Sequence, residues 1–266
     1  MINFISFFYL YFLVVFSLLL FIITLLNIFL SILFTRKNKN FELINLKDKT
    51  PLVSVLVPAR NEEKNIGRCV NSLLEQSYSN IEVIILDDDS SDNTYFISNE
   101  ISKSDSRVTV IKGKKIPKGW LGKNWACHQL SQKATGNFFL FIDSDTKLNP
   151  NLIFDSIKMH INEDLDLLTL FPNRKTSTFI DKFISVTIGW MIFSWIPIFL
   201  ANTSKLPFLS AAFGQFLLFK KDSYMLIGGH QTIKFEILDD FELGRNISRN
   251  KLKLKMINGV KGIDTF

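Results

Sequence analysis

The first 35 residues of the chain contain no charged side chain, and residues 4–34 are almost wholly apolar. About 20 apolar residues are enough to cross the hydrocarbon core of a bilayer as a helix. A cleaved signal peptide would show a basic start, a shorter apolar core and a small-residue cleavage site, and none of these is visible. We therefore expect residues 1–35 to form a retained transmembrane anchor.

Positive charges follow this apolar run at once, at Arg36, Lys37 and Lys39. Basic residues beside a span favour the cytoplasmic side of the membrane. We therefore predict a single N-terminal span in the cell membrane, with everything after residue 35 in the cytoplasm. The two cysteines, Cys69 and Cys127, have neither disulfide nor zinc-site spacing and are expected to be small core residues.

The net charge of +6 arises after the anchor, mostly from dispersed lysines. A mildly basic domain beside a membrane fits attraction to anionic lipid headgroups. No recognised nucleic-acid-binding motif accompanies the charge, so nucleic acid is not an expected partner. The length of 266 residues allows one medium domain in addition to the anchor.

Strand and helix patterns alternate after a polar linker at residues 36–50. Strand patterns occupy residues 53–57, 82–86, 108–111 and 138–142, and helical patterns lie between them. This alternation predicts an α/β fold over residues 51–266, with a mostly parallel sheet flanked by helices. Asn61 is expected to cap the first of these helices, with Glu62 and Glu63 in its first turn.

Two carboxylates, Asp143 and Asp145, directly follow the apolar strand pattern at 138–142. The carboxyl ends of strands in open α/β sheets are where ligands bind. Neighbouring carboxylates repel unless a cation lies between them, and oxygen ligands suit Mg²⁺ or Mn²⁺ bound to phosphates. A single Asp is usually a turn or a cap, but further acids occur at other element boundaries. They are Glu62, Asp87, Asp88, Asp89, Asp239 and Asp240.

Several other enzyme classes lose support from the sequence. No GxGxxG follows a strand pattern and no GxxxxGK[ST] exists, which disfavours dinucleotide-binding dehydrogenases and P-loop enzymes. No GxSxG or HExxH is present, so serine-hydrolase and zinc-protease chemistry is not indicated. The three histidines are scattered and are expected to be structural.

Four segments, taken together and in order, resemble the motifs of family 2 glycosyltransferases: residues 53–63, 86–94, 141–146 and 238–243. The resemblance runs from about residue 51 to 260. Residues 119–126, 214–219 and 228–230 are further similar to a membrane-bound branch with hopanoid-associated and carotenoid (diaponeurosporenoate-type) glycosyltransferases.

This resemblance implies a GT-A fold and a nucleotide-sugar donor, most often a UDP-sugar. Carried over by position, Pro58, Ala59 and Arg60 would lie along the nucleotide, with Glu62 near it. Asp88 would bind the uridine.

The resemblance also implies the groups that act on the diphosphate and on the acceptor. Asp145 would ligate Mg²⁺ or Mn²⁺, Asp143 would lie closer to the ribose, and Lys123 would lie near the nucleotide or diphosphate. Asp240 would be the general base, and one direct displacement would invert the anomeric configuration. A lipid or terpenoid hydroxyl or carboxylate would be the acceptor.

Residues 183–204 form a second uncharged stretch, 22 residues long. One crossing of the bilayer here would put Asp145 and Asp240 on opposite sides, where they could not share a site. We therefore expect this stretch to be interfacial or re-entrant, with Trp190 and Trp195 at headgroup depth. The alternative is a helix buried in the domain core.

The chain departs from many relatives because it lacks a Gln-x-x-Arg-Trp motif and further C-terminal spans. A second interpretation is therefore a truncated, non-catalytic GT-A domain that binds nucleotide-sugar or a partner. A nucleotidyltransferase, which shares the sheet and the metal carboxylates, is a third. The acidic pair Asp239-Asp240 at the start of a helix favours a glycosyltransferase over the third.

Overall fold

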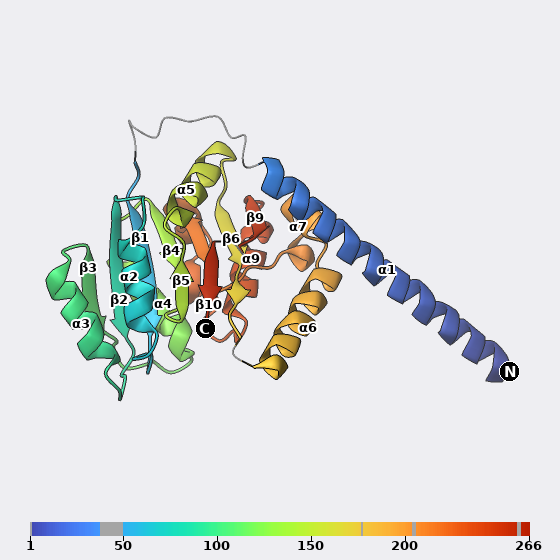
Figure 1. The fold of residues 1–266 in the computed structure, drawn as a ribbon, viewed down its shortest axis with the longest axis horizontal. Helices are drawn as coiled ribbons and strands as arrows, with labels where there is room; N and C mark the ends of the chain where they lie inside the picture. Colours follow the sequence, from blue (N-terminus) through green and yellow to red (C-terminus); the bar gives the residue numbers. More distant parts are fainter. Residues whose placement is uncertain (1, 38–49, 177, 204–205, 260–261) are drawn as a thin grey trace. The chain divides into compact units, whose positions relative to one another are not determined.

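The computed structural model describes residues 2–37, 50–176, 178–203, 206–259 and 262–266. The chain divides into two compact units (Figure 1). The helical unit contains α1 (Ile2–Lys37), α6 (Phe179–Trp195) and α7 (Ile198–Thr203). The sheet unit contains the other elements. Most of the expected linker, including Lys39, lies outside the described residues.

A seven-stranded sheet forms the centre of the sheet unit, in the order β3-β2-β1-β4-β8-β6-β9. All neighbouring pairs are parallel except those of β8, which is antiparallel to both β4 and β6. The predicted α/β fold with a mostly parallel sheet is thus confirmed. The strands are β1 (Val53–Ala59), β2 (Ile81–Asp87), β3 (Val108–Lys112), β4 (Phe138–Phe141), β6 (Leu167–Phe171), β8 (Leu217–Lys220) and β9 (Leu254–Asn258).

The central strands are buried along most of their length because helices cover the sheet. All four residues of β4 are buried, and its neighbour β1 is buried except at Pro58. The covering helix α4 packs against β1 and β2. The helices of this unit are α2 (Ile66–Leu74), α3 (Thr94–Ser104), α4 (Gly122–Lys133), α5 (Leu152–Asn162), α8 (Lys221–Leu226) and α9 (Asp239–Arg249), with short 3₁₀ turns η3 (Pro207–Leu209) and η4 (Gly229–Gln231).

A three-stranded sheet in the order β5-β10-β7 fastens the segment that follows Asp145. The strand β5 (Thr146–Leu148) pairs antiparallel with β10 (Ile263–Thr265). The same β10 pairs in parallel with β7 (Asn173–Arg174). Figure 1 shows β10 beside β5 near the carboxyl end of the chain.

The expected role of Asn61 as a helix cap is wrong. The helix after β1 begins only at Ile66, so Glu62 and Glu63 precede it. Asn61 instead has a left-handed backbone with φ of 55°, which asparagine tolerates better than most residues. Its side chain accepts a 2.9 Å hydrogen bond from the Ser91 N–H, which joins the loop after β1 to the loop after β2.

In the helical unit, α1 is the one described helix long and apolar enough to cross a membrane, over Ser6–Phe29. Only 6% of its apolar window is buried, unlike a core helix of a soluble protein.

Residues 183–203 do not form one straight helix, because α6 ends at Trp195 and Pro197 precedes α7. Side chains along α6 are largely exposed, including Phe183 at 66% and Trp190 at 55%. This exposure contradicts the alternative in which the stretch is buried in a domain core.

Candidate active site

A cleft with a volume of about 360 Å³ opens at the carboxyl ends of β1, β2 and β4. Every residue predicted to bind the donor or the metal lines this cleft: Pro58, Ala59, Arg60, Glu62, Asp88, Lys123, Asp143 and Asp145. Gly122, Ala126 and Ser144 complete the lining. The parallel strand order brings together residues that lie more than 80 positions apart in the sequence. The individual roles of these residues stay predictions.

Arg60 and Asp88 form one side of the cleft, at the ends of β1 and β2. The Asp88 N–H donates to the Ala59 carbonyl at 2.9 Å, and the two side chains form an ion pair at 3.9 Å. Burial, with the charges of Asp87 and Asp89, raises the pKa of Asp88, although Arg60 opposes the shift. Arg60 is 63% exposed, so it is free to reach a ligand in the cleft.

The loop that carries Glu62 is held by the start of α3. The Glu62 N–H donates to Thr94 Oγ1 at 2.7 Å, and the Glu63 N–H donates to Asp92 Oδ2 at 3.1 Å. The Asn93 N–H donates back to Glu63 at 3.1 Å. These reciprocal bonds fix the backbone at the mouth of the cleft before any ligand binds, which reduces the ordering cost of binding.

Asp145 has an environment in which a bound cation would stabilise the ionised carboxylate. Its Oδ1 is buried and has no hydrogen-bond partner within the described part of the chain. Burial, reinforced by the nearby charges of Asp143 and Glu62, raises the pKa of Asp145 to about 6. An uncompensated buried carboxylate is unfavourable, and a divalent cation would reverse that penalty.

The donor set fits a magnesium or manganese ion that is shared with a phosphate ligand. No group of three or more His, Cys, Asp or Glu side chains that could hold a metal exists among the described residues. Mg²⁺ usually takes only one or two protein carboxylates and completes its shell with water and phosphate oxygens. Asp145, with Asp143 beside it, matches that pattern rather than a closed protein cage.

Lys123 links the cleft to the start of α9. It occupies the first turn of α4, and its Nζ lies 2.7 Å from Asp143 Oδ1 and 4.0 Å from Asp239 Oδ2. Burial disfavours its charge, but Asp143 and Asp239 outweigh that effect and raise the pKa of Lys123. Lys123 therefore carries a positive charge between one carboxylate from the loop after β4 and one from the start of α9.

Asp240 does not line the cleft itself, and Gly214 lies beside both Asp240 and Lys123. The N–H groups of Gly214 and Phe241 each donate to its carboxylate at 2.8 Å. A side chain at Gly214 would begin 3.3 Å from Lys123 Nζ and 3.5 Å from Asp240 Oδ2. Burial and then the charge of Asp239 raise the pKa of Asp240, which makes its carboxylate a stronger base.

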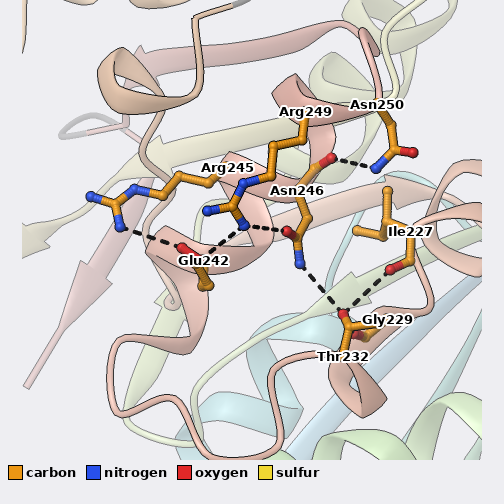
Figure 2. A network of polar contacts seen from close by, with 8 residues as sticks. All are labelled: Ile227, Gly229, Thr232, Glu242, Arg245, Asn246, Arg249 and Asn250. Carbon is orange, nitrogen blue, oxygen red and sulfur yellow. Dashed lines mark hydrogen bonds and ion pairs between the residues drawn. The ribbon is translucent and has the colours of Figure 1, made fainter.

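A polar network fixes the helix that carries Asp240 (Figure 2). Glu242 accepts from Arg249 at 2.9 Å and from Arg245 at 3.4 Å along one face of α9. Asn246 donates to Thr232 Oγ1 at 3.4 Å, and that hydroxyl donates to the Gly229 carbonyl at 2.9 Å. The network therefore ties α9 to the loop that includes η4.

The loop at η4 contains a buried histidine with a structural environment. His230 Nδ1 lies 2.7 Å from the hydroxyl of Tyr224, which is itself buried. Burial, together with the charges of Lys123 and His128, lowers the pKa of His230 to about 3. A histidine that stays neutral and is hydrogen-bonded inside the core agrees with the structural role expected for it.

Two residues of the site were not singled out from the sequence. The sequence indicates Asp239 only as part of an acidic pair, whereas its Oδ2 lies 4.0 Å from Lys123 Nζ. The sequence indicates Gly214 only as the first residue of a motif, whereas its N–H donates to Asp240 at 2.8 Å and its Cα lies beside Lys123. The acidic pair was the available indication for Asp239, whereas the role of Gly214 depends on tertiary packing.

A sequence model described as glycosyl transferase family 2 matches residues 54–227, which is more than half of the chain. The 4,4'-diaponeurosporenoate glycosyltransferase of Staphylococcus haemolyticus (strain JCSC1435) is 28% identical over 219 residues, covering 80% of this chain and 56% of the relative. Its namesake in Staphylococcus aureus (strain USA300) is 26% identical over 240 residues, covering 86% and 60%. The chain thus spans less than two thirds of the length of these relatives.

Solved structures share the fold at low sequence identity. The mannosyltransferase PcManGT from Pyrobaculum calidifontis, solved with GDP-Man and Mn²⁺, has a TM-score of 0.63 at 16% identity, covering 92% of this chain and 67% of that one. S. aureus TarS 1–349, solved with UDP, has a TM-score of 0.57 at 20% identity, covering 80% and 60%. These likenesses show a GT-A fold, and the sequence match shows that the chain belongs to glycosyl transferase family 2.

Proposed function

We propose that this protein is a membrane-anchored glycosyltransferase that moves a sugar from a nucleotide-diphosphate donor to a lipid or terpenoid acceptor. One observation carries the proposal: the strand-end carboxylates and Lys123 gather around one cleft, and Lys123 joins that cleft to the acidic start of α9. This arrangement offers a cation site, a diphosphate counter-charge and a base within one unit of the fold.

The cleft suits a nucleotide diphosphate. Asp88 and Arg60 lie at one side, where a base and ribose would contact them, and Lys123 and Asp145 lie where a metal-bound diphosphate would be held. Structures of the same fold were solved with UDP, with UDP-GlcNAc and with GDP-Man and Mn²⁺, which supports a donor of this class. A UDP-sugar is the donor that we propose, with Mg²⁺ or Mn²⁺ bound through Asp145.

The proposed transfer is a single inverting displacement. The acceptor oxygen forms a bond to the anomeric carbon while the bond from that carbon to the diphosphate oxygen breaks, and the electron pair leaves with the diphosphate. The proton of a hydroxyl acceptor passes to the Asp240 carboxylate. Lys123 provides positive charge close to the leaving group. The bound divalent ion would supply the remaining neutralisation of the diphosphate.

The nature of the acceptor decides how much Asp240 contributes. The relatives named above are named for a carboxylate, and a carboxylate acceptor has no proton to remove at neutral pH. Asp240 would then position the acceptor or the Gly214 backbone rather than act as a base. A substitution of Asp240 therefore distinguishes the two acceptor classes. Transfer to a lipid hydroxyl would depend on Asp240 as a base, and transfer to a terpenoid carboxylate would not.

The proposed location is the cytoplasmic face of the cell membrane, with α1 as a single N-terminal span. The length and exposure of the Ser6–Phe29 window support this, and Arg36 and Lys37 follow it in the sequence. Lys123 connects residues on both sides of the 183–204 stretch within one compact unit, which supports placing the whole site on one side of the membrane.

Calorimetric titration of the full chain in nanodiscs would test the donor proposal. UDP and GDP would each be titrated with Mn²⁺, with Mg²⁺ and with EDTA. We expect metal-dependent binding of UDP, lost in Asp145→Asn and retained in Asp155→Asn, a matched change at an exposed aspartate on α5. Absence of metal-dependent binding to either nucleotide would overturn the proposal, and binding without sugar transfer to any lipid would identify a non-catalytic domain.

A further inference from the structure

The helix α1 is joined to the second apolar stretch by specific polar contacts. Asn27 is only 4% exposed although it lies within the Ser6–Phe29 apolar window. Its Nδ2 donates to the Ile196 carbonyl at 2.7 Å, and its Oδ1 accepts from the Ile198 N–H at 3.0 Å. Three residues earlier, the hydroxyls of Thr24 and Ser194 are hydrogen-bonded at 2.8 Å.

These contacts fall where the backbone of the second stretch is interrupted. Pro197 has no N–H and separates α6 from α7, so Ile196 and Ile198 lie outside the two helices or at their edge. An unsatisfied backbone group is strongly disfavoured in hydrocarbon, and broken helices are tolerated there when protein groups satisfy them. One asparagine side chain satisfies a carbonyl and an N–H on either side of the proline.

We propose that α1, α6 and α7 fold as one membrane-embedded unit in which Asn27 locks the bend at Pro197 to the cytoplasmic half of the span. The exposed faces of α6 and α7 contact the acyl chains of the cytoplasmic leaflet. This inference rests on the membrane anchoring set out under the proposed function, and it makes leaflet lipid the partner of this surface.

The contacts with α1 set the depth of the bend. Asn27 lies nine residues before Arg36, the first charged residue after the apolar run, which is about 14 Å along a helix axis. The Trp195 ring packs edge-on against the Phe16 ring at a centroid distance of 6.0 Å. Phe16 is eleven residues from Asn27, or about 16 Å further into the bilayer. The Trp195 side chain is therefore placed among acyl chains, below the headgroup depth expected from the sequence.

The α6–α7 stretch of this unit cannot cross the bilayer completely. The segments before and after this stretch, up to Lys175 and from Leu206, belong to one sheet unit and so lie on one side. The 17 residues of α6 span about 25 Å, and the 6 residues of α7 are too few for a return crossing. A re-entrant bend held by α1 satisfies both conditions.

The charge distribution on α6 and α7 supports lipid as the occupant of their exposed faces. Asp181 and Lys182 lie in the first turn of α6, and no charged residue follows through Thr203. The exposed apolar side chains continue the lipid-facing surface of α1 rather than forming a separate groove. They include Phe183, Val186, Trp190, Trp195, Phe199 and Leu200.

Fluorescence quenching in vesicles would test the depth. The full chain with Trp120→Phe, Trp125→Phe and Trp190→Phe, which retains Trp195 alone, would be placed in phosphatidylcholine–phosphatidylglycerol vesicles with bromine at a shallow or a deep acyl position. We expect Trp195 to be quenched by brominated acyl chains and to be protected from aqueous iodide. Quenching by iodide and not by bromolipid would overturn the embedded unit.

Cross-linking would test Asn27 itself. A Thr24→Cys/Ser194→Cys pair should oxidise to a disulfide in membranes, and each single variant serves as a blank. Two interhelical hydrogen bonds of typical strength in a membrane correspond to about an eightfold change in the docked population. We expect Asn27→Leu to slow cross-linking by about that factor and Ser17→Leu, on an exposed part of α1, to leave it unchanged. An unchanged rate in Asn27→Leu would overturn the lock.

The two proposals can fail separately. Metal-dependent UDP binding is measured on the sheet unit and does not depend on the position of Trp195. A chain that binds UDP while Trp195 stays in water would retain the proposed reaction and lose the embedded unit. A chain with Trp195 in lipid and no nucleotide binding would do the reverse.

Discussion

The sheet unit and the helical unit bury opposite kinds of side chain. In the sheet unit Phe139 is 0% exposed, and the charged residues of the site gather in an open cleft. In the helical unit Phe183 is 66% exposed, whereas Asn27 and Ser194 are 4% and 1% exposed. A domain in water hides its apolar groups, and a unit in lipid hides its polar ones. The contrast supports the proposal that the helical unit lies in lipid and the sheet unit in water.

The largest expected effect is on the chemistry of the sheet unit. Asp240→Asn keeps the shape of the side chain but cannot accept a proton. With a hydroxyl acceptor we expect the turnover rate to fall by about 10²- to 10⁴-fold with little change in UDP affinity, measured by transfer of radiolabelled sugar. Asp222→Asn, at an exposed position on α8, is the control. A full rate in Asp240→Asn with a hydroxyl acceptor would remove Asp240 as the base.

A pair of identical substitutions tests the contrast in burial directly. Phe139→Ala removes a buried ring on β4 and should lower the unfolding free energy of the sheet unit by about 3–5 kcal/mol. Phe183→Ala removes an exposed ring on α6 and should leave that free energy within about 0.5 kcal/mol of the parent value. Chemical denaturation followed by near-ultraviolet circular dichroism measures both, and equal losses would contradict the division into two environments.

A smaller effect on stability is expected at Asp145, with a sign that depends on pH. Its pKa is raised from 3.8 to about 6, so the folded metal-free protein binds more protons than the unfolded chain between these values. The contribution of Asp145 to the free energy of unfolding therefore falls as the pH rises from about 4 toward 6. Because Asp145 is only partly buried, we expect Asp145→Asn to stabilise the metal-free protein by about 1 kcal/mol at pH 7.5.

Thermal unfolding in EDTA at several pH values measures this gain. The gain should shrink as pH falls from about 6 toward 4, where the parent carboxylate becomes protonated. Added Mn²⁺ with UDP should stabilise the parent much more than Asp145→Asn, since the neutral amide oxygen is a weaker ligand than the carboxylate. A variant that is less stable than the parent in EDTA at pH 7.5 would contradict the unfavourable burial of this charge.

The smallest effect is expected inside the helical unit. Thr24→Val removes the hydroxyl that bonds Ser194 and keeps the side-chain shape. An interhelical hydrogen bond in a membrane contributes about 0.6 kcal/mol on average. The midpoint temperature of thermal unfolding in nanodiscs should therefore fall by less in Thr24→Val than in Asn27→Leu. The second variant loses two hydrogen bonds from the Asn27 side chain to backbone groups. The reverse order would show that the helix contact, rather than the bend, holds the unit together.

Much of the fold followed from local patterns, and the membership of the site followed from those patterns together with the resemblance to family 2 glycosyltransferases. Apolar runs of strand length ended in carboxylates, and the parallel order of β2, β1 and β4 brought Asp88 and Asp145 to the same cleft. Pro197, which the interior of a straight helix rarely tolerates, falls between α6 and α7. Each of these features depends on residues that are close together in the sequence.

The remaining features depend on contacts between distant segments. Strands β5, β7 and β10 are only two or three residues long, so no periodicity reveals them. Asparagine is a common helix cap, but the Asn61 side chain accepts a hydrogen bond from Ser91 instead. Asn27 is a single polar residue in an apolar stretch, and its role is visible only from its hydrogen bonds to residues that lie 169 and 171 positions away.

The pairing of β10 with β5 has a consequence for biosynthesis. The backbone that follows Asp145 is fastened by Ile263–Thr265, more than a hundred residues later in the chain. During translation the central strands β1, β2 and β4 can associate long before that clasp has been made. The carboxylate loop is therefore among the last parts of the sheet unit to be secured, so a nascent chain would complete the Arg60–Asp88 side of the cleft before the backbone after Asp145 is fastened.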